Sequence, residues 1–593
     1  MSQLGDFTAT RRMVLLSGIA VVIGMIASFV ALALLKLIAL FTNLFYFHRL
    51  SFAASSPANH TLGTIAVVVP VVGAFVIGLM ARYGSDRIRG HGIPEALEAI
   101  LTNGSRVSPK VAILKPLSAA ISIGSGGPFG AEGPIIMTGG AFGSIVAQLI
   151  SLTSAERKTL LVAGAAAGMS ATFATPLAAI LLAIELMLFE WKPRSFVPVA
   201  LASATAAVAR PFILGAGPLF AMTPHAGYMG VPLLVCCLVA GLATGCLAAL
   251  VTYAVYAAED LFKRLPIHWM WWPMIGGLAI GLGGLIAPRA LGVGYDVIGD
   301  LLAERMLPAA VVTLVVVKAL IWSISLGSGT SGGVLAPLLI MGSALGALLS
   351  HVLPDGGVGF WPLVGLGAIL GGTMRAPLTG IVFAVELTHD MAMFVPLVIA
   401  VTIAHAFTVL TLKRSILTEK VARRGFHVSC EYAIDELEVL FARDAMQSAI
   451  VVLPQTATVG DLIAQVGIGP REEHSQRLFP IVDDTASLVG AITFATLRAH
   501  ADAPDTPVVA LASAAPNQML SNETLRSGVE RMAILGITRL LVMNPNDPTK
   551  LVGKLALHDI LKARNQHLQD ERRRERVLPW EHLTAAIRRV ARG

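Results

Sequence analysis

The chain has 593 residues, of which 55% are hydrophobic and 14% are charged, and its formal net charge is +7. This length exceeds a single ordinary domain, and the low charge raises the question of where the apolar residues concentrate. The basic residues gather near the ends of apolar runs and in the C-terminal tail, so the positive charge does not indicate nucleic-acid binding and we expect no such partner.

Apolar residues concentrate between Val14 and about Leu412, in runs long enough to span a bilayer of roughly 30 Å. The expected membrane runs cover 13–43, 62–82, 111–150, 159–188, 197–214, 231–257, 269–287 and 307–326. After Lys413 the composition is that of a soluble α/β protein. The sequence therefore predicts an all-α polytopic membrane domain followed by a soluble α/β tail.

Basic residues flank the apolar region on both sides. Arg11 and Arg12 precede the first run, and Lys413 and Arg414 follow the last one. Because positive residues next to membrane spans favour the cytoplasmic side, both termini are expected there. The first run is too long for a signal peptide and lacks a small-residue cleavage site, so we expect it to remain as a span.

One stretch inside the apolar region, Gly124–Pro134, contains five glycines and two prolines. These residues break a helix, and Pro134 restarts one. Broken backbone at membrane depth survives only where it is buried in protein or lines a wet cavity, and a restarting helix directs its free N–H groups into that cavity. Glu132 lies at the same place, and an ionisable residue inside a membrane is a functional candidate. We interpret the stretch as an anion site with a competing carboxylate.

A second break, Gly90-His91-Gly92-Ile93-Pro94, leads into another helical run. Alone, this motif fits two interpretations. It is either a cytoplasmic turn that caps a helix or a second helix N-terminus aimed at the same anion. The sequence of the motif does not decide between them.

Parts of the first half recur in the second half. Residues 365–387 repeat the pattern of residues 164–186 at an offset of 201, and residues 333–346 repeat residues 130–143 at an offset of 203. Two matches at nearly equal offset indicate a duplicated membrane unit. Broken helices at corresponding places of two such units predict a transport site where the repeats meet.

The soluble tail also reads as two similar units, about 442–500 and 506–563. The strands expected in them are Ser448–Leu453, Leu478–Val482, Leu488–Thr493, Arg539–Met543 and Leu551–Leu555. A strand–helix–strand–strand–helix order that occurs twice is typical of a paired regulatory module rather than a catalytic one.

Taken in this order and spacing, the glycine motifs resemble those of the CLC family of chloride channels and proton-coupled chloride transporters, and the tail resembles a tandem pair of CBS domains. The resemblance covers about residues 15–565. Gly90–Pro94 is similar to the first anion-binding motif of the family and Gly333–Pro337 to the third. Gly130–Pro134 is similar to the second, in which Glu132 corresponds to the gating glutamate.

This resemblance implies a membrane domain of inverted repeats with broken helices over residues 1–425, CBS domains over 426–503 and 504–565, and a basic tail over 566–593. It also implies a homodimer in a bacterial inner membrane, with cytoplasmic CBS domains and one chloride pathway per subunit. The anion-binding residues that it implies are Gly90, His91, Gly92, Ile93, Gly133, Gly333, Val334, Leu335, Ala336 and Lys413.

The chain departs from the family pattern at several of these positions. His91 replaces a serine, Leu335 replaces a phenylalanine, and Lys413 aligns where an inner tyrosine is usual. Leu186 stands where exchangers of the family carry an inner proton-relay glutamate, and an alkyl side chain cannot carry a proton. Glu185 has its match at the corresponding place of the other repeat, which favours a structural role.

We therefore expect a passive chloride channel gated by Glu132, with nitrate or fluoride as other anions that the fold could carry. The alternative is a proton-coupled antiporter whose inner relay is water, Glu185 or Glu190. Enzymatic activity is not expected, because the apolar region contains no Ser/His or paired-Asp arrangement and no cluster of metal ligands.

In the tail, two residues resemble parts of the nucleotide-binding signature of CBS pairs. Thr493 matches in the first unit and Asp559 in the second, so each unit keeps half of the signature. We expect a structural dimerisation module that requires no cofactor. Regulation by an adenine nucleotide is the alternative.

Overall fold

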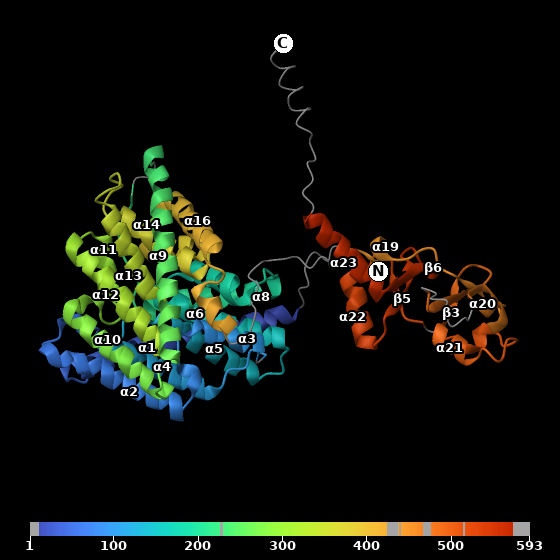
Figure 1. The fold of residues 1–593 in the computed structure, drawn as a ribbon, viewed down its shortest axis with the longest axis horizontal. Coiled ribbons are helices and arrows are strands. Elements are labelled where there is room, and N and C mark those ends of the chain that lie inside the picture. Colours follow the sequence, from blue (N-terminus) through green and yellow to red (C-terminus); the bar gives the residue numbers. More distant parts are fainter. Residues whose placement is uncertain are drawn as a thin grey trace, which may run out of the picture. The chain divides into compact units, whose positions relative to one another are not determined.

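The structure is a computed structural model that describes residues 11–102, 104–225, 229–423, 437, 440–466, 476–513 and 516–572. Contacts between residues divide the chain into two compact units, Met1–Glu431 and Tyr432–Gly593. The first unit is helical and the second contains the strands (Figure 1). Most of the predicted basic tail, residues 573–593, lies outside the described residues.

The first unit is a bundle of long and broken helices. Its α-helices are α1 (Arg12–Phe47), α2 (Val68–Tyr83), α3 (Ile93–Thr102), α4 (Pro109–Gly124), α5 (Glu132–Gln148), α6 (Ser154–Phe173), α7 (Pro176–Ala183), α8 (Pro193–Ile213), α9 (Val231–Lys263), α10 (Trp272–Ile286), α11 (Tyr295–Leu302), α12 (Pro308–Gly327), α13 (Leu335–Leu349), α14 (Phe360–Met374), α15 (Pro377–Thr388), α16 (Phe394–Thr411) and α17 (Ile416–Arg423). A π-helical turn, Ile184–Leu188, extends α7.

Seven helical segments of the described chain are long and apolar enough to cross a membrane. Other helices are shorter and nearly enclosed by the bundle: every residue of α14 is buried, as are twelve of the fifteen residues of α13. Longer helices therefore surround α13 and α14. This arrangement suits these two helices, because broken backbone at membrane depth needs to lie within protein rather than in lipid.

The break predicted in Gly124–Pro134 is present. Helix α4 ends at Gly124 and α5 begins at Glu132. Gly126 has φ +99°, a conformation that side chains rarely adopt, and the N–H of Phe129 turns back to the carbonyl of Gly127 at 2.8 Å. The chain thus stops one helix and starts the next within a few buried residues.

The duplication predicted from the sequence also has a structural counterpart. The proline-started helices α7 and α15 follow α6 and α14, respectively, and the short helices α5 and α13 precede them. Both connections pass through a residue with positive φ, Ala174 after α6 and Arg375 after α14. The two halves therefore repeat one order of broken helices.

The second unit contains two three-stranded sheets with one shared design. The strands are β1 (Leu453–Pro454), β2 (Leu478–Val482), β3 (Leu488–Thr493), β4 (Gln518–Leu520), β5 (Arg539–Asn544) and β6 (Asp547–Ala556). In each sheet the first strand pairs in parallel with the second, which pairs antiparallel with the third. The helices of this unit are α19 (Ala442–Ala445), α20 (Val459–Val466), α21 (Phe494–Ala499), α22 (Leu525–Leu535) and α23 (Leu557–Arg572).

One predicted strand is wrong in its extent. Ser448–Leu453 was expected to be a strand, but β1 begins only at Leu453. The side-chain amide of Gln476 explains the difference, because it accepts from the N–H of Val451 and donates to its carbonyl, both at 2.8 Å. A side chain therefore satisfies backbone groups that a neighbouring strand would otherwise bond.

Candidate anion pathway

The three glycine motifs meet in the middle of the first unit. Gly130 and Gly333 exchange two backbone hydrogen bonds, of 3.1 and 3.0 Å, although they come from different halves of the chain. Gly90 bonds to the same strand-like segment: its N–H donates to the carbonyl of Thr330, and its carbonyl accepts from Gly332, both at 3.3 Å. The expectation that the repeats bring their broken helices together is confirmed.

Glycine is required at this junction because the backbones touch. A Cβ atom on Gly133 would lie 1.8 Å from the carbonyl oxygen of His91, and one on Gly92 would lie 2.4 Å from the carbonyl oxygen of Gly133. Neither neighbour is a flexible side chain that could move aside. The close approach places the first and second motifs in direct contact.

Three helices begin at the junction: α3 at Ile93, α5 at Glu132 and α13 at Leu335, with Val334 before it. Their first N–H groups have no partner within the helix, and the helix dipoles place partial positive charge there. The candidate residues Gly90, His91, Gly92, Ile93, Gly133, Gly333, Val334, Leu335 and Ala336 are all buried. The geometry suits a dehydrated anion, which stays a prediction at these residues.

Glu132 is fully buried at the start of α5. The hydroxyl of Tyr295 donates to its Oε1 at 3.2 Å, and the backbone N–H of Ala336, in the first turn of α13, also faces the carboxylate. The Glu132 side chain therefore lies against the helix end that an anion would use. Sequence reasoning identified Glu132 but missed Tyr295.

Tyr295 is held firmly in place. Its ring packs edge-on against Phe173 and Phe220, at centroid distances of 6.1 and 6.5 Å. The turn before it is anchored by Lys318, whose Nζ donates to the carbonyls of Ala290 and Gly292 at 2.9 and 3.1 Å. Ring packing and the Lys318 hydrogen bonds thus position the Tyr295 hydroxyl toward Glu132.

A matching lysine supports the first motif. Lys115 is fully buried, and its Nζ donates to the carbonyls of Ile88 and Gly90 at 2.8 and 2.7 Å. The segment Gly292-Val-Gly-Tyr295 corresponds to Gly90-His-Gly-Ile93, with positive φ at both glycines of each. This third internal match was the signal that could have identified Tyr295 from the sequence.

The first motif carries an ion pair that the sequence did not indicate. Oε2 of Glu95 accepts from the N–H of Gly92 at 2.6 Å, and its Oε1 lies 2.8 Å from Nζ of Lys420. Lys420 therefore reaches this motif, whereas the side chain of Lys413 is exposed in the turn before α17. His91 is buried beside this pair and interacts electrostatically with Glu95.

Glu185 and Glu386 cap each other's helices across the two repeats. Glu185 accepts from the N–H groups of Leu378 and Thr379 at 3.1 and 2.9 Å, at the start of α15. Glu386 accepts from those of Leu177 and Ala178 at 3.0 and 2.8 Å, at the start of α7. The structural role expected for this pair agrees with these bonds.

The neighbouring position is apolar, since Leu186 is buried and 4% exposed. Glu190 lies beyond the π-helical turn, where its Oε1 accepts from the Ser195 hydroxyl at 2.6 Å. Burial would raise the pKa of Glu190, but this hydrogen bond and nearby basic side chains outweigh it, so the pKa lies below its ordinary value. Glu190 therefore stays ionised near neutral pH.

The chain was compared with known proteins. Residues 72–409 match the model of a protein family described as voltage gated chloride channel. This chain belongs to that family. A protein of Citrobacter koseri named H(+)/Cl(−) exchange transporter ClcA is 31% identical over 352 residues, which are 56% of this chain and 72% of the relative.

Two further comparisons extend this relationship. A Ralstonia nicotianae protein provisionally named a ClcB-like chloride channel is 29% identical over 344 residues, 56% of this chain and 80% of its own length. The crystal structure of a eukaryotic CLC transporter aligns with a TM-score of 0.57 at 20% identity and covers 92% of this chain and 98% of that one. The last comparison shows the fold, and at 92% coverage it extends into the C-terminal unit.

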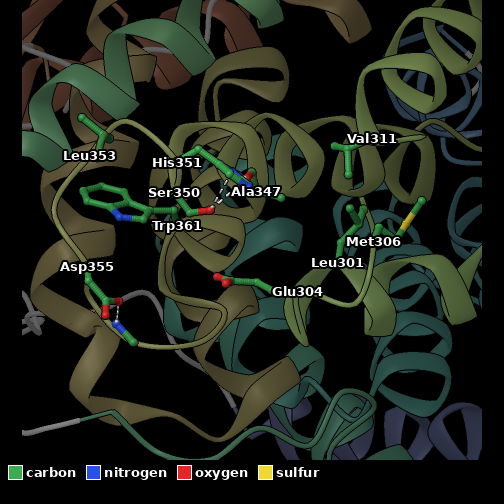
Figure 2. Close-up of a pocket in the computed structure, with 11 residues that line it drawn as sticks. Leu301, Glu304, Met306, Val311, Ala347, Ser350, His351, Leu353, Asp355 and Trp361 are labelled. Atoms are coloured by element: carbon green, nitrogen blue, oxygen red, sulfur yellow. Dashed lines mark hydrogen bonds between the residues drawn. The ribbon is translucent and has the colours of Figure 1, made fainter. Parts of the chain in front are cut away.

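Two cavities adjoin Tyr295 in this CLC chain. One, of about 550 Å³, lies among α1, α8 and the turn before α11, and the other, of about 680 Å³, lies over α11. A separate cavity has a volume of about 370 Å³. Its lining residues include Glu304, His351 and Trp361 (Figure 2), and no residue of the three glycine motifs is among them. The two cavities beside Tyr295 therefore lie next to a residue that bonds Glu132.

The C-terminal unit has its own cavity, of about 830 Å³. Thr493 lines it together with Arg477, Arg498 and Arg539. Asp559 does not line it, because its carboxylate is buried and accepts from the Gln447 side chain at 2.8 Å and from the N–H of Ala556 at 2.9 Å. The structure therefore brings only one of the two predicted nucleotide residues to this cavity.

Proposed function

We propose that this protein is a proton-coupled chloride exchanger in which Glu132 is both the gate and the proton carrier. The observation that carries the proposal is a buried carboxylate at the meeting point of three helix N-termini from two repeats. An anion and an ionised Glu132 would compete for the same N–H groups. The position of the Glu132 carboxylate could therefore couple the movement of chloride to that of a proton.

The coupling follows from charge. When Glu132 is ionised, its carboxylate takes the Tyr295 hydrogen bond and lies against the N–H of Ala336. Protonation of a carboxylate oxygen removes the negative charge that holds it there, so chloride can take the place and the neutral side chain can leave with its proton. Chloride entry on the same helix ends would, in turn, favour release of the side chain.

The similarity to a relative named as an exchange transporter supports this choice over the passive channel that Leu186 suggested. Leu186 favours a channel only if the inner proton route needs a carboxylate at that position. Glu185 is committed to the α15 cap, and Glu190 stays ionised, so neither suits as a relay. We infer that water carries the proton on the inner side, which requires no side chain at Leu186.

The test uses the full chain reconstituted in liposomes that hold a chloride gradient and no proton gradient. Net chloride movement down its gradient is expected to drive protons uphill in the opposite direction, followed by a pH-sensitive dye while a chloride electrode records the anion. Chloride flux without proton movement would refute exchange. It would support the second candidate, a passive channel, which the alkyl side chain of Leu186 favours.

We also propose that the protein is a homodimer in a bacterial inner membrane, with its termini and C-terminal unit in the cytoplasm. The family resemblance and the basic residues that flank the apolar region support this arrangement. Chloride is the proposed anion, and the exchange assay repeated with nitrate and fluoride measures its preference.

For the C-terminal unit, we propose a CBS pair that takes a phosphate-bearing ligand, with an adenine nucleotide as the ligand to test. Two sheets of the same strand order support the pairing. Three arginines that line the cavity, Arg477, Arg498 and Arg539, support a phosphate-bearing ligand, because one guanidinium group can donate two parallel hydrogen bonds to phosphate oxygens.

Titration calorimetry with ATP on the purified full-length protein tests this site. Arg498→Gln is expected to weaken ATP binding about tenfold, the effect of losing one charge-assisted contact. Arg443→Gln serves as the matched control, because Arg443 lies in α19 and does not line the cavity. Equal ATP affinity in both variants, or no binding by the unmodified protein, would contradict the proposal.

A further inference from the structure

Tyr295 connects the cavity of about 550 Å³ with the gate. Tyr295 lines this cavity, and its hydroxyl donates to Glu132 at 3.2 Å. The cavity walls come from α1, α6, α8 and the turn before α11, and hydroxyl-bearing residues such as Ser55 and Thr172 are among them. An anion in this cavity would lie next to the position that the Glu132 carboxylate occupies.

Among the described residues that line the cavity, Arg210 is the one basic residue. It lies in the last turn of α8 and is only 8% exposed. Its Nη1 donates to the carbonyls of Gly215 and Gly217 at 2.6 and 3.4 Å, while its Nε is buried and makes no hydrogen bond among the described residues.

The charge of Arg210 is also uncompensated. No carboxylate of the described chain lies within ion-pair distance of its guanidinium group. Asp296 is the one acidic residue among the described residues that line the cavity, and it is exposed. The hydroxyl oxygen of Ser55, which also lines the cavity, is likewise buried and has no hydrogen-bond partner in the described chain.

A buried cation with an unused N–H group is costly unless a negative group accompanies it. Arginine does not escape this cost by losing its proton, since its pKa is too high. The carbonyls of Gly215 and Gly217 satisfy one nitrogen but supply no full negative charge. A mobile anion in the cavity would supply the charge and accept from both unused donors.

We propose that this cavity is an anion-binding site outside the gate, which holds one small monovalent inorganic anion between Arg210 and the Ser55 hydroxyl. It supplies the anion that takes the place of Glu132 when that side chain leaves. The proposal rests on the proposed function only in taking Glu132 as the gate; it does not require proton coupling.

The test measures chloride flux against chloride concentration in liposomes, at constant ionic strength maintained with an impermeant anion. Arg210→Gln keeps a side-chain donor for the loop carbonyls but removes the charge. It is expected to raise the half-saturating chloride concentration about fivefold and to leave the flux at saturating chloride unchanged. Arg210→Lys keeps the charge and is expected to stay within about twofold of the unmodified protein.

Ser55→Ala provides the second measurement, with a smaller rise of about twofold expected from the loss of one neutral donor. An unchanged half-saturating chloride concentration in Arg210→Gln would overturn the proposed site. An equal rise in Arg210→Gln and Arg210→Lys would also overturn it, because the lost charge would then not be the cause. Proton movement is recorded in the same vesicles. If the unmodified protein moves no protons while Arg210→Gln still raises the half-saturating chloride concentration, the exchange proposal is refuted and the proposed anion site is not.

Discussion

Replacing Glu132 with Gln is expected to abolish proton movement while chloride flux continues. Glutamine keeps the size and polarity of the side chain but neither carries a proton nor competes as an anion. Proton movement in the liposome assay should fall at least about tenfold, to the background of empty vesicles. Chloride flux in the same vesicles should remain measurable.

The pH dependence should disappear together with the coupling. In the unmodified protein, ionised Glu132 occupies the anion position at high pH, so chloride flux should rise as the pH falls and the carboxylate takes up a proton. In Glu132→Gln the flux should be flat between about pH 4 and pH 8, because the side chain no longer titrates. A variant that still couples protons, or keeps the same pH profile, would remove Glu132 from the proposed role.

Replacing Gly133 with Ala is expected to disrupt the junction of the motifs. The added Cβ would meet the carbonyl oxygen of His91 at 1.8 Å and Cα of Gly333 at 3.1 Å, both of which are backbone atoms. Overpacking of this kind costs about 1–3 kcal/mol even where neighbours can shift, and here the neighbouring backbone segments are bonded to each other. The melting temperature of the purified protein should fall by several degrees, and chloride flux should be largely lost.

Gly18→Ala is the matched control for this substitution. Gly18 also lies in a helix of the membrane unit, but a Cβ atom there would meet nothing within 4 Å. Alanine favours a helix over glycine, so the melting temperature should stay equal or rise slightly. If Gly133→Ala transports chloride and melts like the control, the close contact between the first two motifs does not determine the pathway.

Much of the membrane unit could be predicted from the sequence, because helix breaks inside a bilayer have few explanations. Glycine and proline around Glu132 marked both the break and its burial. Recurrence of the pattern at Gly333 indicated that a second break would meet the first. These inferences depended on local residue types and on two internal matches at nearly equal offsets.

The contacts that hold the site together could not be predicted in the same way. The internal match of Gly292–Tyr295 with Gly90–Ile93 could have marked Tyr295 as a candidate, but its contact with the Glu132 carboxylate appears only in the fold. Lys413 was selected by alignment, but the direction of a side chain after a turn depends on packing, and Lys420 is the residue that reaches the first motif. Asp559 was selected by type, yet two local hydrogen bonds already use its carboxylate.

The exchange of caps between Glu185 and Glu386 has a consequence for biosynthesis. Leu177, whose N–H lies at the start of α7, is synthesised 209 residues before Glu386, whose carboxylate accepts from it. An N–H group without a partner in a bilayer costs several kcal/mol. We therefore expect the start of α7 to reach its final arrangement only after Glu386 has been synthesised, so that the two halves complete their folding together.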